Sequence, residues 1–199
     1  MRGLEIGPGM FRAKGFETFN LGEGKRSDGE SGEDHVGDAR DLSRFDQEFD
    51  YVYSSHCLEH VHWYELHETV RQWASVLKPA GVLEIHVPNG LEVMEEMIRW
   101  EKGEVLTRPS AHDLGWRKAL TRKHPFLWLQ GKLYNYTKTR GVDFDYQLHR
   151  SMLTPKFLTE LFTDAGMTDV VVLREDQNYV PDNQKRHGWM NLGVRGIKK

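Results

Sequence analysis

Cysteine is nearly missing from this 199-residue sequence, which contains only Cys57. A single cysteine excludes an internal disulfide and a cluster of cysteine metal ligands. The sequence also has no run of about 20 apolar residues that could span a membrane, and no apolar targeting segment of signal-peptide length near its first residue. We therefore expect a cytoplasmic protein of a reducing compartment, with no membrane as a partner.

Neither sign of charge dominates, because the net charge is only -3 at pH 7. As a whole, the chain is therefore not a binder of polyanions. Internal repeats and low-complexity tracts are missing as well. Apolar residues make up 38% of the sequence, which is enough for one domain with a sizeable core and too little for two. We expect a single domain over residues 1–199, and its oligomeric state stays open.

Short apolar runs, several of them ended by glycine or proline, alternate with segments of helical spacing. The runs that we expect to form buried strands are residues 4–6, 16–21, 35–37, 50–53, 82–87, 170–173 and 189–194. Apolar residues recur at helical spacing over 63–77, where Lys78-Pro79-Ala80-Gly81 stops the helix, and a second helix is expected over 155–165. This alternation predicts an α/β sandwich of the Rossmann-like kind, with a mostly parallel seven-stranded sheet.

One long segment interrupts the alternation after the fifth expected strand, where a compact fold needs only a short crossover. Within it, residues 108–150 contain nine Lys or Arg against three Asp, together with seven aromatic residues. We interpret residues 90–150 as an insertion that forms a substrate-binding cap, since long connections in compact domains often carry function. The alternative is a surface insertion with a small satellite core.

The segment Glu5-Ile6-Gly7-Pro8-Gly9 places an acid inside the first strand and glycines in the turn after it. In such sheets, ligands bind at the carboxyl ends of the strands, and glycine lets the backbone approach them closely. An acid here would repel a pyrophosphate, and the dinucleotide pattern requires glycine where Arg12 stands. A ligand with a positive amino group fits better, which favours the methionine end of S-adenosylmethionine.

Three further motifs follow in order: Gly37-Asp38-Ala39-Arg40-Asp41-Leu42, Ser54-Ser55-His56-Cys57-Leu58-Glu59-His60 and Leu77-Lys78-Pro79-Ala80-Gly81. An acid such as Asp38 can accept a hydrogen bond from an adenine amino group, or it can cap a helix. Together these motifs resemble class I S-adenosylmethionine-dependent methyltransferases of the small-molecule branch, and most of all short bacterial and phage predicted methyltransferases. The resemblance covers residues 2–89 and resumes at 146–150.

The resemblance implies S-adenosylmethionine as the cofactor and assigns it three groups of contacts. It places Glu5, Gly7, Pro8 and Gly9 at the methionine part, Asp38, Ala39 and Arg40 at the adenine, and Ser54, Ser55 and His56 where the fourth strand closes the site. The family usually clasps the ribose with an acid at the end of the second strand. Here that position is Gly22, beside Asn20 and Leu21, and Asn20 or Glu23 would have to substitute.

Histidines gather near the fourth strand, where His56 and His60 are four residues apart and could share a helical face. Metal sites need suitably spaced ligands, but the resemblance accounts for these histidines without one, so we expect no metal. His149 is the candidate catalytic residue, because an imidazole can take a proton from a hydroxyl near neutral pH. The alternative for His149 is an exposed loop residue. Cys57 is expected to be a small core residue.

The sequence thus predicts methyl transfer to a small-molecule or sugar acceptor, anionic because of the basic insertion. One alternative is a nucleic-acid methyltransferase, since basic and aromatic residues bind phosphates and bases. Against it, Ser54-Ser55-His56-Cys57 stands where base-methylating enzymes carry an Asn/Asp-Pro-Pro-aromatic motif. Another alternative is a non-catalytic binding protein, suggested by Gly22 at the ribose position.

Overall fold

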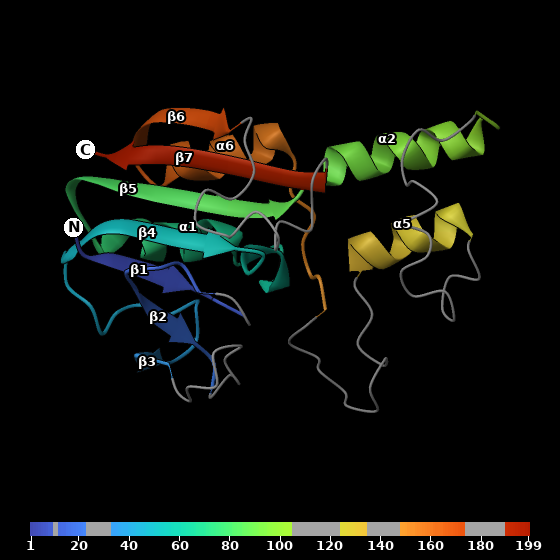
Figure 1. The fold of residues 1–199 in the computed structure, drawn as a ribbon. Coiled ribbons are helices and arrows are strands. Elements are labelled where there is room, and N and C mark those ends of the chain that lie inside the picture. The colour runs from blue at the N-terminus through green and yellow to red at the C-terminus, as the bar shows by residue number, and fades with distance from the viewer. Residues whose placement is uncertain (10–11, 23–32, 105–123, 135–147, 174–189) are drawn as a thin grey trace.

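A seven-stranded sheet with the order β3-β2-β1-β4-β5-β7-β6 lies at the centre of the fold (Figure 1). This computed structural model describes residues 1–9, 12–22, 33–104, 124–134, 148–173 and 190–199. The strands are β1 (Gly3–Ile6), β2 (Phe16–Asn20), β3 (His35–Val36), β4 (Phe49–Ser55), β5 (Leu77–Pro88), β6 (Met167–Leu173) and β7 (Asn191–Lys198). Neighbours among β1 to β5 pair in parallel, whereas β7 runs antiparallel to both β5 and β6. The predicted Rossmann-like sheet is confirmed.

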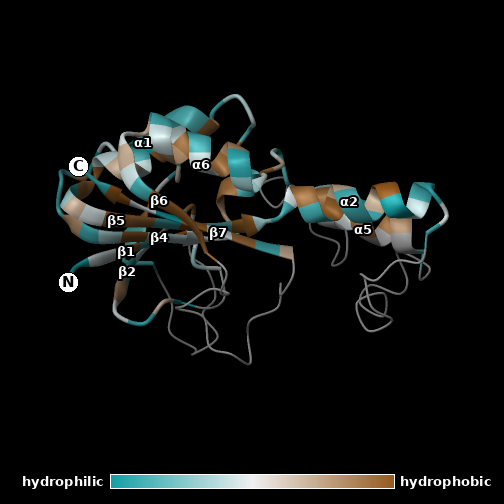
Figure 2. Cartoon of the chain, turned by 90° about the horizontal axis from the view of Figure 1, so that it is seen from above, coloured by the Kyte–Doolittle hydropathy of each residue, from teal (hydrophilic) through white to brown (hydrophobic). Residues whose placement is uncertain are grey.

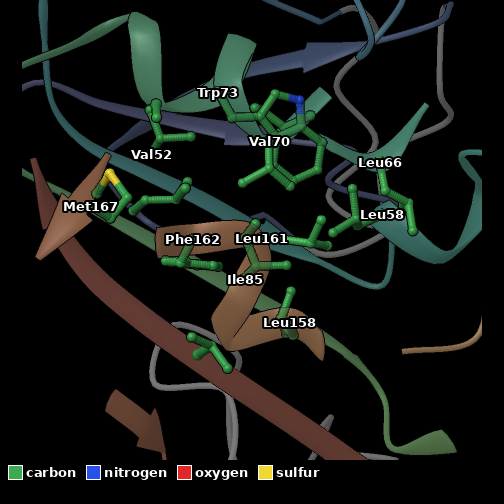
Figure 3. Close-up of a cluster of buried hydrophobic side chains, with 14 of the residues drawn as sticks. Val52, Leu58, Leu66, Val70, Trp73, Ile85, Leu158, Leu161, Phe162 and Met167 are labelled. Atoms are coloured by element: carbon green, nitrogen blue, oxygen red, sulfur yellow. The ribbon is translucent and has the colours of Figure 1, made fainter. Parts of the chain in front are cut away.

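Two helices, α1 (Leu66–Ser75) and α6 (Pro155–Asp164), cover one face of the sheet (Figure 2). Their apolar side chains, among them Trp73 and Phe162, meet Ile85 of β5 in a continuous buried core (Figure 3). Thr154 begins α6, because its side-chain oxygen accepts a hydrogen bond from the backbone N–H of Phe157. The main core thus lies between these two helices and the sheet.

The start of β5 differs from the sequence expectation. Residues 63–77 were expected to form one helix, but α1 ends at Ser75 and Leu77 already pairs with Phe49 of β4. The pairing register then shifts, and Ala80 adopts a left-handed conformation with φ of 63°. The turn-forming residues 78–81 therefore bulge out of the strand rather than precede it.

The connection between the parallel strands β1 and β2 consists only of residues 7–15. Parallel strands normally need a crossover of a dozen or more residues, usually a helix. Here the described residues of the connection contain no helix. Within the described part of the chain, no α-helix lies on the sheet face opposite α1 and α6 (Figure 2).

The segment expected as an insertion contains α2 (Gly90–Glu101) and α5 (Pro125–Tyr134), which lie side by side beyond the sheet (Figures 1 and 2). Val93 of α2, Leu129 of α5 and Met190 form a buried cluster separate from the main core. The satellite core of the alternative interpretation is therefore present. Residues 105–123 and 135–147 of the insertion lie outside the described residues, and the role of a cap stays a prediction. No helix in the described ranges has the length and apolar character that crossing a membrane demands.

Candidate functional site

The carboxyl ends of the parallel strands bring the predicted cofactor residues to one edge of the sheet. Ile6 of β1 pairs with Phe19 on one side and with Ser54 on the other, and Asn20 pairs with Val36. The segments that follow these strands are therefore neighbours in space. They contain Gly7, Pro8 and Gly9 after β1, Asn20, Leu21 and Gly22 at the end of β2, Asp38, Ala39 and Arg40 after β3, and Ser54, Ser55 and His56 at the end of β4.

The two glycines after β1 have different surroundings. Both adopt positive φ, 69° at Gly7 and 58° at Gly9, a conformation that L side chains avoid. A Cβ atom at Gly7 would lie 2.6 Å from the Cβ and Sγ atoms of Cys57, whereas one at Gly9 would meet no heavy atom of the described residues within 4 Å. Gly7 therefore lets the turn pack against the segment after β4.

Glu5 is held inside the fold. Its side chain is 3% exposed, and its carboxylate accepts a hydrogen bond of 2.7 Å from the backbone N–H of Ala13. Burial raises the pKa of Glu5 to about 7, although the hydrogen bond from Ala13 and the charge of Arg12 act in the opposite direction. This hydrogen bond between Ala13 and Glu5 fixes the short connection between β1 and β2.

Asp38 lies in a turn after β3 and faces Arg40. Its carboxylate accepts hydrogen bonds from the backbone N–H of Arg40 and from the Arg40 guanidinium, which also binds Glu65. The hydrogen bonds from the Arg40 side chain hold the pKa of Asp38 below its ordinary value. Residues 39 and 40 form a turn rather than a helix, so the interpretation of Asp38 as a helix cap is wrong.

The end of β2 carries the position where an acid was expected. The amide oxygen of Asn20 accepts a hydrogen bond of 3.0 Å from the backbone N–H of Leu21, and its backbone carbonyl accepts one from Gly37. A Cβ atom at Gly22 would meet no heavy atom within 4 Å among the residues that the structure describes. Glu23 lies outside the described residues. Among residues 20–22, only Asn20 offers a polar side chain.

A second group of polar side chains surrounds Glu59, which lies in the short 3₁₀ helix η1 (Leu58–His60). His56 Nδ1 lies 3.2 Å from Glu59 Oε1, and His149 Nε2 lies 4.0 Å from the same oxygen. The rings of His60 and His149 meet edge to face, with centroids 5.1 Å apart. Burial raises the pKa of Glu59, but the hydrogen bond from His56 and the nearby imidazoles outweigh it and lower this pKa to about 2.

Backbone hydrogen bonds bring His149 to this group. The N–H groups of Arg150 and Ser151 both donate to the carbonyl oxygen of Glu59, at 2.8 Å and 3.2 Å. The His149 side chain is 13% exposed, so it is not the exposed loop histidine of the alternative interpretation. Glu59 is not among the site residues expected from the sequence, although its position three residues after His56 is a signal.

A buried chain of polar contacts continues from His56 through the sheet. His56 Nε2 lies 3.3 Å from the Asn191 side-chain oxygen, and the Asn191 side-chain nitrogen lies 2.9 Å from His86 Nδ1. His86 in turn contacts Glu84, which accepts a hydrogen bond from the Tyr51 hydroxyl. His56 therefore has a partner at each ring nitrogen, Glu59 in η1 and Asn191 in β7, and no sequence motif pointed to Asn191.

Comparisons with known proteins agree with this architecture. A family model described as a methyltransferase domain matches residues 2–172. No protein among those with curated descriptions matches the sequence. A methyltransferase from Methanosarcina mazei, described as S-adenosylmethionine-dependent, has a similar structure, with a TM-score of 0.54, 16% identity, and coverage of 99% of this chain and 92% of that chain.

A second similar structure, described as a S-adenosylmethionine-dependent methyltransferase from Archaeoglobus fulgidus, has a TM-score of 0.51 and 16% identity over 99% of this chain and 86% of that chain. Identities this low establish the fold alone. Some matching structures are longer: this chain spans 48% of the CurJ carbon methyltransferase structure, at 14% identity over 99% of this chain and a TM-score of 0.47, and 61% of a possible exported protein from Bordetella parapertussis.

Proposed function

The chain belongs to the family of S-adenosylmethionine-dependent methyltransferase domains, and from this premise we propose that it transfers a methyl group to a small-molecule or sugar acceptor that carries negative charge. The observation that supports the proposal most is the edge formed by the carboxyl ends of β1 to β4. In sheets of this kind, ligands bind outside these ends. The glycine turn after β1, the amide of Asn20 in β2 and the carboxylate of Asp38 after β3 come from three neighbouring strands at this edge.

The residues at this edge fit the cofactor. No heavy atom of the described residues lies within 4 Å of a Cβ position at Gly9, and we assign the segment from Gly7 to Gly9 to the methionine end of the cofactor. The Asp38 side chain is 38% exposed, so its carboxylate can accept a hydrogen bond from the adenine amino group. Asn20 is the candidate for the ribose hydroxyls. When bound, the cofactor supplies a methyl group already activated on a sulfonium.

We place the acceptor beside His56 and the Glu59 group, because these residues follow β4 at the same edge. Methyl transfer is a direct displacement, so the chain must align the acceptor and exclude water. Where the reacting atom carries a proton, His149 is our candidate to accept it. The buried Glu59 carboxylate, 4.0 Å from His149 Nε2, would stabilise the positive imidazolium.

The charge of the acceptor follows from the insertion. Residues 108–150 carry a net +6 within a chain of net charge -3. We propose that residues 90–150 form a cap that attracts a phosphate or carboxylate on the acceptor. Neutralising Arg117, Lys118, Arg122 and Lys123 together should then raise the acceptor's KM much more than it weakens cofactor binding. A steep loss of acceptor binding with salt would instead favour a nucleic acid, because phosphate contacts release counterions.

Cofactor binding is the first experiment. S-adenosylhomocysteine at a hundredfold excess over its Kd should stabilise the fold by about 2.7 kcal/mol. For a chain of this size, that corresponds to a rise in Tm on the order of 5 to 10 °C. NAD at the same concentration is the control. Stabilisation by NAD and none by millimolar S-adenosylhomocysteine would refute the proposal, and binding without turnover of any acceptor would favour a non-catalytic protein.

A further inference from the structure

The side chains of Glu59, His60 and His149 each offer a ligand atom, and these atoms lie within 4.8 Å of one another. We propose that these three residues form a site for a divalent metal ion that binds and activates an oxygen of the acceptor. The activation of the acceptor by the metal rests on the proposed function, whereas the metal site itself does not. From the sequence we expect no metal, because the family resemblance accounts for the histidines without one, and the proximity of His149 to Glu59 and His60 is seen only in the structure.

A buried oxygen atom of Glu59 supports this site independently. The Glu59 side chain is 2% exposed, and its Oε2 atom is buried with no hydrogen-bond partner among the described residues. A buried carboxylate oxygen without a partner is costly and calls for an explanation. A metal ion bound by the carboxylate would remove this cost, because the ion would replace the missing hydrogen-bond donor.

The surroundings of His60 prepare it as a ligand. His60 Nδ1 lies 3.1 Å from the carbonyl oxygen of Leu148. Since a carbonyl only accepts, this contact places the proton on Nδ1 and leaves the Nε2 lone pair for a metal. Metal-binding histidines usually donate their other N–H to a carbonyl or carboxylate in this way. His56 contacts Glu59 Oε1 at 3.2 Å. It orients the carboxylate without being one of the three metal ligands.

A loaded site requires the three ligand atoms, which lie within 4.8 Å of one another, to move closer together. Zinc binds nitrogen and oxygen ligands at about 2.0–2.2 Å, so neighbouring ligand atoms in a loaded site lie about 3 to 3.5 Å apart. His149 Nε2 and Glu59 Oε1 are now 4.0 Å apart, and side-chain rotations can close this difference. Three protein ligands leave positions open for water or substrate, as in catalytic rather than structural sites.

The ligand set also predicts which metals bind. Two imidazoles and one carboxylate suit Zn²⁺, Co²⁺ and Mn²⁺, whereas Mg²⁺ prefers sites built from oxygen ligands alone. An acceptor hydroxyl bound at an open position would lose its proton more easily, because the ion's charge lowers its pKa. In the loaded state His149 is then a ligand, and the metal rather than His149 favours loss of the proton.

The test is direct binding of metals to protein freed of metal by a chelator. Calorimetric titration with Zn²⁺, Co²⁺, Mn²⁺ and Mg²⁺ separately, with no cofactor present, should show one equivalent of Co²⁺ or Zn²⁺ and much weaker Mg²⁺. Bound Co²⁺ should add visible absorption bands typical of nitrogen and oxygen ligands. Glu59→Gln and His149→Gln should each weaken Co²⁺ binding at least tenfold. His67→Gln is the control, since His67 is exposed and pairs with Asp164.

S-adenosylhomocysteine binding by the two ligand variants shows whether each has folded, and the titration is interpreted on those that bind it. Should both bind Co²⁺ as tightly as the wild type, or should none of the four metals bind the wild type stoichiometrically, the proposed site is wrong. If metal binds as expected but S-adenosylhomocysteine does not bind the wild-type protein, the site stands and the proposed function fails. For that case, urea unfolding replaces ligand binding as the check on the variants.

Discussion

Replacing Glu5 with glutamine tests whether this acid serves the fold rather than the ligand. Burial raises its pKa to about 7 from the ordinary 4.5. Because the folded-state pKa is the higher one, the protonated side chain stabilises the fold fully below about pH 4.5. This stability is lost as pH rises towards 7, and the difference amounts to about 3 kcal/mol at about 1.4 kcal/mol per pKa unit. Glutamine keeps an oxygen for the Ala13 N–H and never ionises.

We therefore expect Glu5→Gln to match the wild type at pH 4.5 and to exceed its stability by up to about 3 kcal/mol at pH 8. Urea unfolding of both proteins at the two pH values measures this, and the comparison cancels every contribution that the two proteins share. Glu101→Gln, at an exposed residue, is the matched control. If Glu5→Gln is the less stable protein at pH 8, the ionised carboxylate is favourable in the fold and the reasoning fails.

Three further outcomes are expected. Asp38→Ala should weaken S-adenosylhomocysteine binding by about 1 to 3 kcal/mol, the cost of one unpaired partner; unchanged affinity in calorimetry would leave Asp38 as only the partner of Arg40. Gly7→Ala should lower stability in urea more than Gly103→Ala, since both glycines have positive φ but, of the two, only Gly7 has a close neighbour within the described part of the chain. The Cys57 thiol should react with iodoacetamide far more slowly at pH 8 in the native than in the unfolded protein, because burial and then Glu59 raise its pKa to about 12.

Local patterns predicted the sheet well, whereas the cofactor contacts at its carboxyl edge stay a prediction. The apolar runs gave the strands, and the glycines at 7 and 9 marked the turn after β1, because turn chemistry depends on neighbouring residues. The predicted ends of helices and strands were less accurate where tertiary pairing decided them. Leu77 continued a helical pattern, but pairing with Phe49 placed it in β5. The helix α2, which Asn89 caps, was hidden within the insertion.

The chemistry around Glu59 could not be predicted in the same way. His149 joins Glu59 only because backbone hydrogen bonds from Arg150 and Ser151 attach a distant segment to η1. The contact between Glu5 and Ala13 likewise depends on how a short connection turns back over the sheet. Such contacts arise from the three-dimensional path of the chain, and spacing along a single sequence does not contain them.

The separate cluster of Val93, Leu129 and Met190 affects how readily helices α2 and α5 open. Among the described residues, the buried apolar side chains of α2 and α5 belong to a cluster separate from the main core, so we expect this helix pair to open at a lower cost in free energy than global unfolding. Amide protons of α2 should therefore exchange with solvent faster than those of β1 and β4 under native conditions. If the cap lies over the carboxyl edge of the sheet, product would leave at the rate at which this helix pair opens, while the sheet stays folded.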